Sequence, residues 1–163
     1  ISCAGVTVVI VRKDLLDQAM PICPTMLKWS TQAKENSLYN TPPCFSIYIA
    51  SLTLKWLKNL GGIPAIQKIN EEKAKMLYDY IDNSGFYTNP VRPEDRSMMN
   101  VPFVSPSKEL DAEFVAGEEA NGIMAIKGHR LVGGMRASIY NAMPVEGVKH
   151  LIAYMQKFAA EHK

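Results

Sequence analysis

The chain has 163 residues, 47% hydrophobic and 21% charged, and its 18 basic and 16 acidic residues leave a net charge of +2. This composition excludes general disorder, and the mixing of both signs along the chain excludes the basic tails that bind nucleic acid. No apolar run is long enough to span a bilayer, and no secretory signal is recognisable. We therefore expect a soluble, cytoplasmic protein with neither nucleic acid nor a membrane as partner.

Residues 1–44 are typical of the end of an α/β domain. The β-branched run at 6–12 predicts a strand covered on both faces of a sheet. Residues 13–44 contain four prolines and predict a long connecting segment, where functional residues often concentrate. Because the chain opens directly at this strand and without an initiator Met, we expect it to be a piece of a longer protein.

The three cysteines predict neither a metal site nor a disulfide. Cys3, Cys23 and Cys44 are odd in number, and their spacing fits neither a set of metal ligands nor a disulfide framework. A free cysteine behaves as a small hydrophobic residue. We expect all three to be reduced and buried.

Residues 45–84 predict two long helices that connect one domain to the next. Between Phe45 and Leu60, apolar residues recur at intervals of three and four, which predicts an amphipathic helix that Gly61 and Gly62 can end. A second helix is expected from about Pro64, with Lys73 among the residues on its apolar side. It should end at the Asn-Ser-Gly turn of residues 83–85.

Residues 85–163 predict a small α+β domain. Short strands are expected at 86–89, 98–104, 123–126 and 137–140, and the proline within the second of them favours an edge or a bulge. Residues 109–121 predict a helix. The last helix should have Pro144 at its first position, followed by apolar residues at helical spacing as far as Phe158.

Two residues ahead of the first long helix could bind an anion. Asn40 and Thr41 are preferred residue types at a helix N-terminus, and prolines follow them. The free N–H groups and the dipole of a helix N-terminus attract a phosphate, and Thr41 adds a hydroxyl donor. On the sequence alone, a plain helix cap is the favoured explanation of the same residues, since caps are far more common than phosphate sites.

The segment KGHRLVGGMRASIYNA, residues 127–142, is a second candidate anion site. Arg136 stands at the start of a predicted strand, from which its guanidinium can meet a carboxylate with two hydrogen bonds. His129 and Arg130 could hold a second anionic group of the same ligand. A solvated basic loop with a flexible Gly-Gly turn is an alternative that the spacing alone does not exclude.

Four motifs give the sequence a specific resemblance. It is similar to the C-terminal part of the phosphoserine aminotransferases, which are class-V pyridoxal-phosphate enzymes of fold-type I. The motifs are AGVTVVIVRKDLL (4–16), SLYNTPPCFSIY (37–48), RSMMNVPF (96–103) and KGHRLVGGMRASIYNA (127–142). The resemblance implies an α/β fold in three parts: the end of the large cofactor-binding domain (1–44), the connecting helices (45–84) and the small α+β domain (85–163).

The resemblance also implies roles for particular residues. Asn40 and Thr41 would bind the phosphate of pyridoxal 5′-phosphate in the neighbouring subunit of a homodimer. Arg136 would bind the substrate α-carboxylate, and His129 with Arg130 would bind the distal phosphate of phosphoserine or the side-chain carboxylate of glutamate. The implied reaction converts glutamate and 3-phosphohydroxypyruvate into 2-oxoglutarate and phosphoserine, in the biosynthesis of serine, and a related substrate could serve pyridoxine biosynthesis.

No catalytic residue is expected within the chain itself. The resemblance implies that the Schiff-base lysine lies just upstream of Ile1, so the chain alone should be inactive. Two alternatives remain: a non-catalytic module of the same fold that binds anions or dimerises, and an aminotransferase of the same fold type with another substrate.

Overall fold

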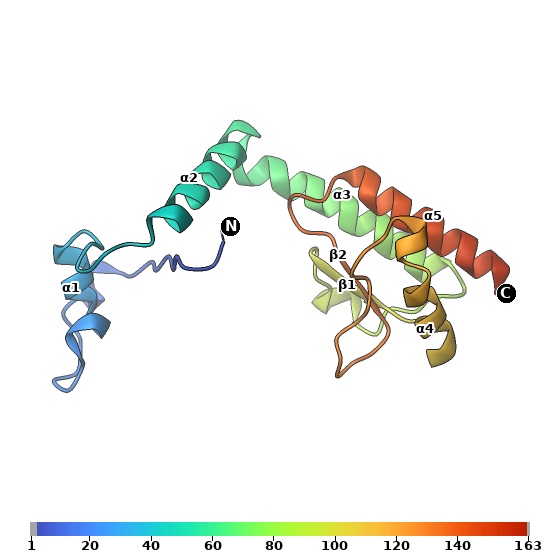
Figure 1. Cartoon of the computed structure of the whole chain (residues 1–163), viewed down its shortest axis with the longest axis horizontal. Helices are drawn as coiled ribbons and strands as arrows, with labels where there is room; N and C mark the ends of the chain where they lie inside the picture. Colours follow the sequence, from blue (N-terminus) through green and yellow to red (C-terminus); the bar gives the residue numbers. More distant parts are fainter. Residues whose placement is uncertain (1–2, 163) are drawn as a thin grey trace. The chain divides into compact units, whose positions relative to one another are not determined.

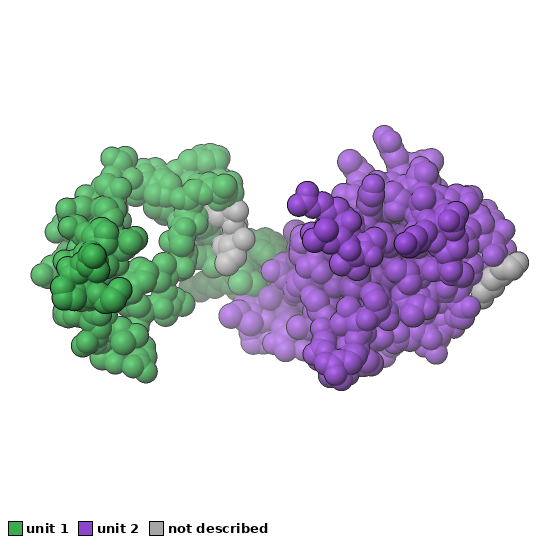
Figure 2. All heavy atoms as spheres, turned by 90° about the horizontal axis from the view of Figure 1, so that it is seen from below, with its two compact units in different colours: residues 1–60 green, residues 61–163 purple. Residues whose placement is uncertain are grey.

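The computed structural model describes residues 3–162, which form parts of two compact units, Ile1–Leu60 and Gly61–Lys163 (Figure 2). We call them the N-terminal unit and the C-terminal unit. Their boundary falls inside the segment 45–84 that the sequence predicts as a connector. Among the described residues, none of the helices combines the length and the apolar character needed to cross a bilayer.

The N-terminal unit consists of short helical segments and one long helix (Figure 1). They are the 3₁₀ helices Lys13–Leu15 and Thr25–Leu27 and the α-helices α1 (Trp29–Lys34) and α2 (Cys44–Asn59). Helix α2 confirms the first predicted helix. Ser46 is its buried residue, and the Ser46 hydroxyl donates to the carbonyl oxygen of Ala4 at 2.9 Å.

The strand predicted at 6–12 is wrong for the described structure. The segment is extended but pairs with no other described segment, and Val8 and Ile10 are 79% and 96% exposed. A strand needs the backbone groups of a neighbour, and a run that is apolar on both faces needs cover on both faces. Neither is supplied by the described residues of this unit.

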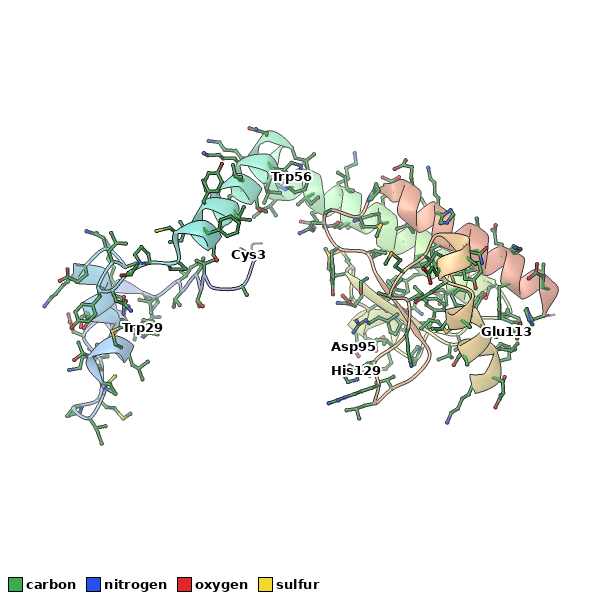
Figure 3. All side chains as sticks on the ribbon, viewed as in Figure 1. Cys3, Trp29, Trp56, Asp95, Glu113 and His129 are labelled. Carbon is green, nitrogen blue, oxygen red and sulfur yellow. The ribbon has the colours of Figure 1, made fainter. Side chains whose placement is uncertain are left out.

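The predicted burial of the cysteines is also wrong. Cys3 and Cys44 are exposed, and Cys23 is partly exposed. Cys3, labelled in Figure 3, donates a hydrogen bond from its Sγ to the Ser46 hydroxyl at 3.5 Å. The described buried hydrophobic residues all belong to the C-terminal unit, so no hydrophobic core covers the cysteines.

The C-terminal unit packs three helices against a small antiparallel sheet (Figure 1). Helices α3 and α5 run beside each other, and the sheet has two strands, β1 and β2. The elements in chain order are α3 (Gly62–Asn83), the 3₁₀ helix Pro93–Asp95, β1 (Asn100–Phe103), α4 (Lys108–Ala116), the 3₁₀ helix Glu119–Asn121, β2 (Met135–Ser138) and α5 (Val145–Glu161).

Several predicted boundaries need correction. Helix α3 begins at Gly62 rather than near Pro64, α4 ends at Ala116, and Pro144 caps α5 instead of occupying its first turn. The strand predicted at 86–89 is reduced to an isolated bridge at Thr88, and the strand predicted at 123–126 does not form, although an isolated bridge follows it at Lys127. These segments are too short and too irregular to continue the ladder beyond one pair.

Aromatic side chains fill the core of the C-terminal unit. The rings of Phe103 and Phe114 meet edge to face, with centroids 5.9 Å apart, and Tyr87 meets Phe103 in the same way at 5.6 Å. The buried hydroxyl of Tyr87 donates to the carbonyl oxygen of Met155 at 3.0 Å. Burial raises the pKa of Tyr87, so this hydroxyl keeps its proton and remains a donor.

The sheet has one buried and one open face. In the register, Asn100 lies opposite Ser138 and Pro102 lies opposite Arg136. Because side chains alternate along a strand, these four residues share the open face. The buried face carries Val101, Phe103, Met135 and Ala137, which belong to the core.

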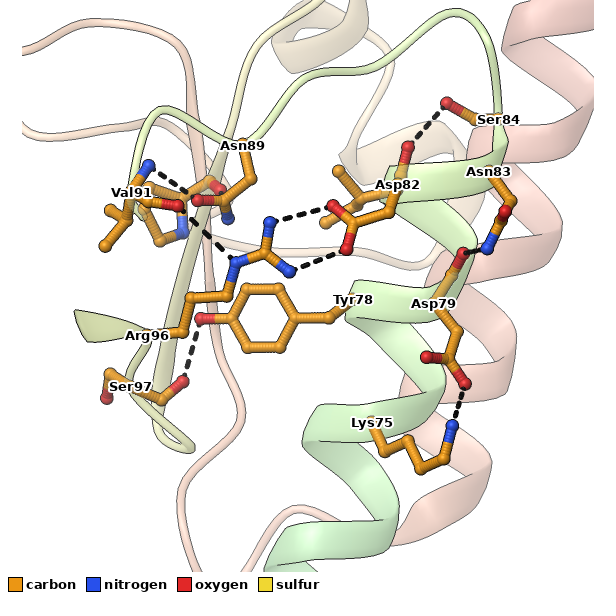
Figure 4. Close-up of polar contacts among 12 residues, drawn as sticks. Lys75, Tyr78, Asp79, Asp82, Asn83, Ser84, Asn89, Val91, Arg96 and Ser97 are labelled. Carbon is orange, nitrogen blue, oxygen red and sulfur yellow. Dashed lines mark hydrogen bonds and ion pairs between the residues drawn. The ribbon is translucent and has the colours of Figure 1, made fainter. Parts of the chain in front are cut away.

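An arginine cluster fixes the segment that leads into β1 (Figure 4). Arg96 donates two hydrogen bonds to the carboxylate of Asp82 on α3, at 2.6 and 2.8 Å, and its guanidinium lies 4.7 Å from the centre of the Tyr78 ring. The Tyr78 hydroxyl donates to the carbonyl oxygen of Ser97 at 2.9 Å. The RSMMNVPF motif is therefore anchored at its first two residues.

A buried lysine fixes the segment that follows β2. Lys73 on α3 is 0% exposed, and its ammonium donates to the carbonyl oxygens of Ile139, Tyr140 and Met143 at 3.2, 2.8 and 2.9 Å. Burial lowers the pKa of Lys73. Three donors meet three acceptors, so the ammonium is satisfied without a carboxylate.

We predict that Lys73→Met lowers the free energy of unfolding by about 2 to 4 kcal/mol, because three carbonyl groups lose their donor at once. Urea denaturation of the full-length protein measures the change. The matched control is Lys75→Met on the same helix, which removes an exposed pair with Asp79 and should cost less than about 1 kcal/mol. Equal effects of the two variants would contradict the prediction.

Candidate functional site

The segment 127–135 folds into a tight hairpin loop. Lys127 pairs with Met135, the Gly128 N–H donates to the Gly134 carbonyl at 2.8 Å, and the Arg136 N–H donates to the Ile126 carbonyl at 2.7 Å. At the end of the loop, the carbonyl of His129 accepts from two N–H groups. The loop is closed by these backbone bonds.

Glycine is required in this loop for close packing. A Cβ at Gly128 would overlap the carbonyl oxygen of Gly133, and a Cβ at Gly134 would lie 2.7 Å from Val104 Cγ1. Gly134 also has a φ of +63°, which a side chain disfavours. Gly128 and Gly134 therefore have a packing role. The interpretation of the Gly-Gly pair as a flexible turn did not include this role.

His129, labelled in Figure 3, and Arg130 lie at the exposed end of the loop. Both residues line a cavity of about 730 Å³. His129 Nδ1 accepts from the Leu131 N–H at 3.3 Å, which leaves Nε2 as the donor of the neutral ring. Arg130 has no hydrogen-bond or ion-pair partner between residues 3 and 162 that would neutralise it. Both side chains are free to bind an anion.

The cavity has an excess of positive charge that the sequence interpretation overlooked. Lys108, from the first turn of α4, and Lys127 also line it. The one lining carboxylate, Asp111, accepts at Oδ1 from the N–H and the hydroxyl of Ser105, at 2.7 and 2.6 Å. The sequence places Lys108 just after a serine that can cap a helix, which indicates a position in the first turn. Only the fold shows that this turn lies beside the loop.

Arg136 lies outside this cavity, on the open face of the sheet. It is absent from the residues that line the cavity, and its Nε is buried without a partner among the described residues. A buried guanidinium nitrogen without an acceptor is costly. An anion bound at this face would satisfy it, which makes Arg136 a second candidate anion position, separate from the cavity.

Asn40 and Thr41 lie in the N-terminal unit, but they do not cap α2 as predicted. The helix begins at Cys44 with Pro43 as its N-cap, and the Cys44 N–H donates to the Pro42 carbonyl at 2.9 Å. A residue before proline is excluded from helical geometry, so Pro42 and Pro43 delay the start of the helix. Both predicted residues precede it.

The donor set of this segment nevertheless fits a phosphate. The side chains of Asn40 and Thr41 are exposed and make no hydrogen bond with another described residue. An amide, a hydroxyl and the first N–H groups of α2 are donors that suit a doubly charged phosphate. The segment therefore fits the phosphate of a cofactor.

Lys73 has two features of a catalytic lysine, burial and a lowered pKa, but it cannot act as one here. All three of its donors are used by backbone carbonyls, as described above. No cluster of three or more metal-ligating side chains occurs within residues 3–162 either.

Residues 1–151 match the family Aminotransferase class-V. The chain belongs to this family. A phosphoserine aminotransferase of Burkholderia vietnamiensis (strain G4 / LMG 22486) is 59% identical over 158 residues, which are 97% of this chain and 44% of that protein. One of Streptococcus suis (strain 05ZYH33) is 59% identical over 160 residues, 98% of this chain and 44% of that protein. The chain thus spans less than half the length of these relatives.

Solved structures of class-V aminotransferases agree with this assignment. The phosphoserine aminotransferase from Bacillus circulans subsp. alkalophilus matches with a TM-score of 0.89 and 46% identity, over 94% of this chain and 43% of that chain. The pyridoxal-phosphate-bound enzyme from Trichomonas vaginalis gives 0.82 and 41%, over 90% and 42%. The predicted fold, part of a fold-type I aminotransferase, is confirmed.

We predict that Gly128→Ala opens the hairpin loop, because the added methyl group meets a backbone oxygen that cannot move without breaking the Gly128–Gly134 bond. Hydrogen exchange of the Arg136 amide in the full-length protein should become at least about tenfold faster. Leu131→Ala is the control, since the Leu131 side chain in the same loop is 83% exposed. Unchanged protection in Gly128→Ala would contradict the prediction.

Proposed function

We propose that this chain is the C-terminal part of a phosphoserine aminotransferase. The enzyme transfers the amino group of glutamate to 3-phosphohydroxypyruvate and yields phosphoserine and 2-oxoglutarate, in serine biosynthesis. The observation that carries the proposal is the presence of two separate cationic positions on one hairpin, Arg136 on the sheet and His129 with Arg130 at the loop. The relatives at 59% identity bear this name and support it.

The two positions match what the two amino-acid substrates share and how they differ. Both carry an α-carboxylate, which a planar guanidinium such as that of Arg136 binds with two hydrogen bonds. Their other ends carry a phosphate or a carboxylate. A pair of His129 and Arg130, with two lysines around the same cavity, accommodates both, because their N–H groups donate equally to phosphate and to carboxylate oxygens.

We propose that Asn40 and Thr41 hold the phosphate of pyridoxal 5′-phosphate. When bound, the cofactor supplies the electron sink of transamination. The residues of this chain then position the substrate, because Arg136 at one end and His129 with Arg130 at the other fix its orientation. The lysine that anchors the cofactor is expected before Ile1, as the resemblance implies.

Further features of the whole enzyme belong to the proposal. They are a homodimer in which Asn40 and Thr41 reach the neighbouring subunit's cofactor, a cytoplasmic location, use of a related substrate in pyridoxine biosynthesis, and the division into three parts at 1–44, 45–84 and 85–163. Apolar side chains along α2 are exposed, among them Phe45 and Tyr48, whose exposed fractions are 70% and 60%. This exposure supports the proposal that further protein packs against α2 in the whole enzyme.

The assay that tests the reaction supplies glutamate and 3-phosphohydroxypyruvate to the full-length protein with pyridoxal phosphate and measures 2-oxoglutarate. Turnover of this pair is expected. A protein that binds the cofactor but acts on neither substrate would favour the non-catalytic module, and one that prefers another amino donor or acceptor would favour a different aminotransferase.

We predict that Arg136→Ala in the full-length protein raises KM for glutamate and for phosphoserine by about 100-fold, equivalent to about 3 kcal/mol of charge-assisted hydrogen bonding. The absorbance of bound pyridoxal phosphate should be retained. Arg92→Ala, which removes an exposed arginine paired with Asp95, is the control and should leave both KM values unchanged. Near-normal KM values in Arg136→Ala would defeat the assignment.

We predict that Thr41→Ala weakens pyridoxal-phosphate binding about tenfold, because one hydroxyl donor to a charged phosphate is lost. Fluorescence titration of the apoprotein with pyridoxal phosphate measures the change. Thr53→Ala is the control: the Thr53 hydroxyl donates to the Ile49 carbonyl within α2 and is expected to contact no ligand. Equal cofactor affinity in wild type and Thr41→Ala would count against this role.

A further inference from the structure

Asn100 stands next to Arg136 on the open face of the β1–β2 sheet. In the register, Asn100 lies opposite Ser138 and Pro102 lies opposite Arg136. Asn100 and Arg136 are therefore diagonal neighbours on the same face. Side chains at such diagonal positions are close enough to contact the same small ligand. Nothing in the reaction proposed above has used Asn100.

The side-chain oxygen of Asn100 is already occupied. The hydroxyl of Ser138 donates to Oδ1 at 3.4 Å, and the hydroxyl of Tyr140 donates to the same atom at 3.2 Å. In this orientation the oxygen of the carboxamide accepts from both hydroxyls, and the NH₂ group is turned away from them. The Nδ2 group has no acceptor within residues 3–162, and its two N–H donors remain available.

The backbone on both sides of this amide is held in place. The Asn100 N–H donates to the Ser97 hydroxyl at 3.2 Å, and the Ile139 N–H donates to the Met99 carbonyl at 2.9 Å. The carbonyl of Tyr140 is one of the three acceptors of Lys73. A donor on such a fixed frame loses little conformational entropy when it binds a ligand.

The open face has the character of an anion site. It presents the partly buried guanidinium of Arg136, whose Nε lacks an acceptor among the described residues, together with a proline and a serine. A carboxylate has about four lone-pair positions and accepts more hydrogen bonds than one guanidinium provides. A neutral amide adds donors without adding a second charge that would need compensation.

We propose that Asn100 donates a hydrogen bond from Nδ2 to the carboxylate that Arg136 binds. The ligand class is an α-amino or α-keto carboxylate, and Asn100 is a second binding residue for the end that all substrates share. This inference rests on the proposed function of Arg136. The amide also selects against ligands that offer no acceptor at this position.

The variant Asn100→Asp tests the donor and leaves the frame intact. The aspartate is nearly isosteric, and one of its oxygens still accepts from Ser138 and Tyr140, while the other replaces the NH₂ donor by an anionic acceptor. Asn83→Asp is the control, because it adds the same charge at an exposed position on α3. Both variants are made in the full-length protein loaded with pyridoxal phosphate.

Two unreactive ligands distinguish the loss of one hydrogen-bond donor from a general disruption of the site. 3-Phosphoglycerate carries a phosphate and a carboxylate, and 2-hydroxyethyl phosphate lacks the carboxylate. By calorimetry, Asn100→Asp should raise Kd for 3-phosphoglycerate about tenfold or more and leave Kd for 2-hydroxyethyl phosphate within about twofold, whereas Asn83→Asp should change neither.

The outcomes distinguish this inference from the proposed function. An unchanged Kd for 3-phosphoglycerate in Asn100→Asp, or an equal weakening of both probes, would overturn the role of Asn100 and leave that of Arg136 standing. A wild-type protein that binds 3-phosphoglycerate no better than 2-hydroxyethyl phosphate would overturn both.

Discussion

The C-terminal unit depends on one buried cation. Lys73 reaches from α3 to three carbonyl oxygens of residues 139–143, directly after the strand that carries Arg136. Taking an ammonium out of water is costly, and only a complete set of acceptors offsets that cost. The segment must therefore keep one conformation, and with it the exit of β2 is fixed against α3. The Arg96–Asp82 pair fixes the entrance of β1 to the same helix. A charged side chain thus holds the start of β1 and the end of β2 against α3. The aromatic core packs between these two attachment points.

The two candidate anion positions of the hairpin differ in rigidity. Arg136 starts from a paired strand whose opposite face lies in the core, which would suit the α-carboxylate that the proposed substrates share. His129 and Arg130 lie on a loop, which would suit the distal group, in which the proposed substrates differ. The backbone contact between Gly128 and Gly133 keeps that loop short. Under the proposed function, a substitution in the loop would alter binding of the distal group without disturbing the strand.

The sequence predicted those elements whose signal is local. The long helices at 45–60 and 64–83 and the last helix were found because their apolar residues recur at helical spacing, and the basic hairpin was found by composition.

Features that depend on distant residues were missed. The run at 6–12 looks like a buried strand, yet the described structure supplies no neighbour for it. Lys73 was correctly expected on the apolar side of its helix. Its acceptors lie 66 to 70 positions later in the sequence, and no local pattern predicts them. Asn100 is likewise inconspicuous until the register places it beside Arg136.

The long separation between Lys73 and its acceptors has a consequence for synthesis on the ribosome. Helix α3 is complete long before residues 139–143 and α5 have been translated, so for that interval its apolar side and its lysine lack the partners that cover them. The ammonium stays hydrated during that interval, and its removal from water is offset only when the three carbonyls are in place. The unit can therefore close only after residue 143 and α5 have been translated.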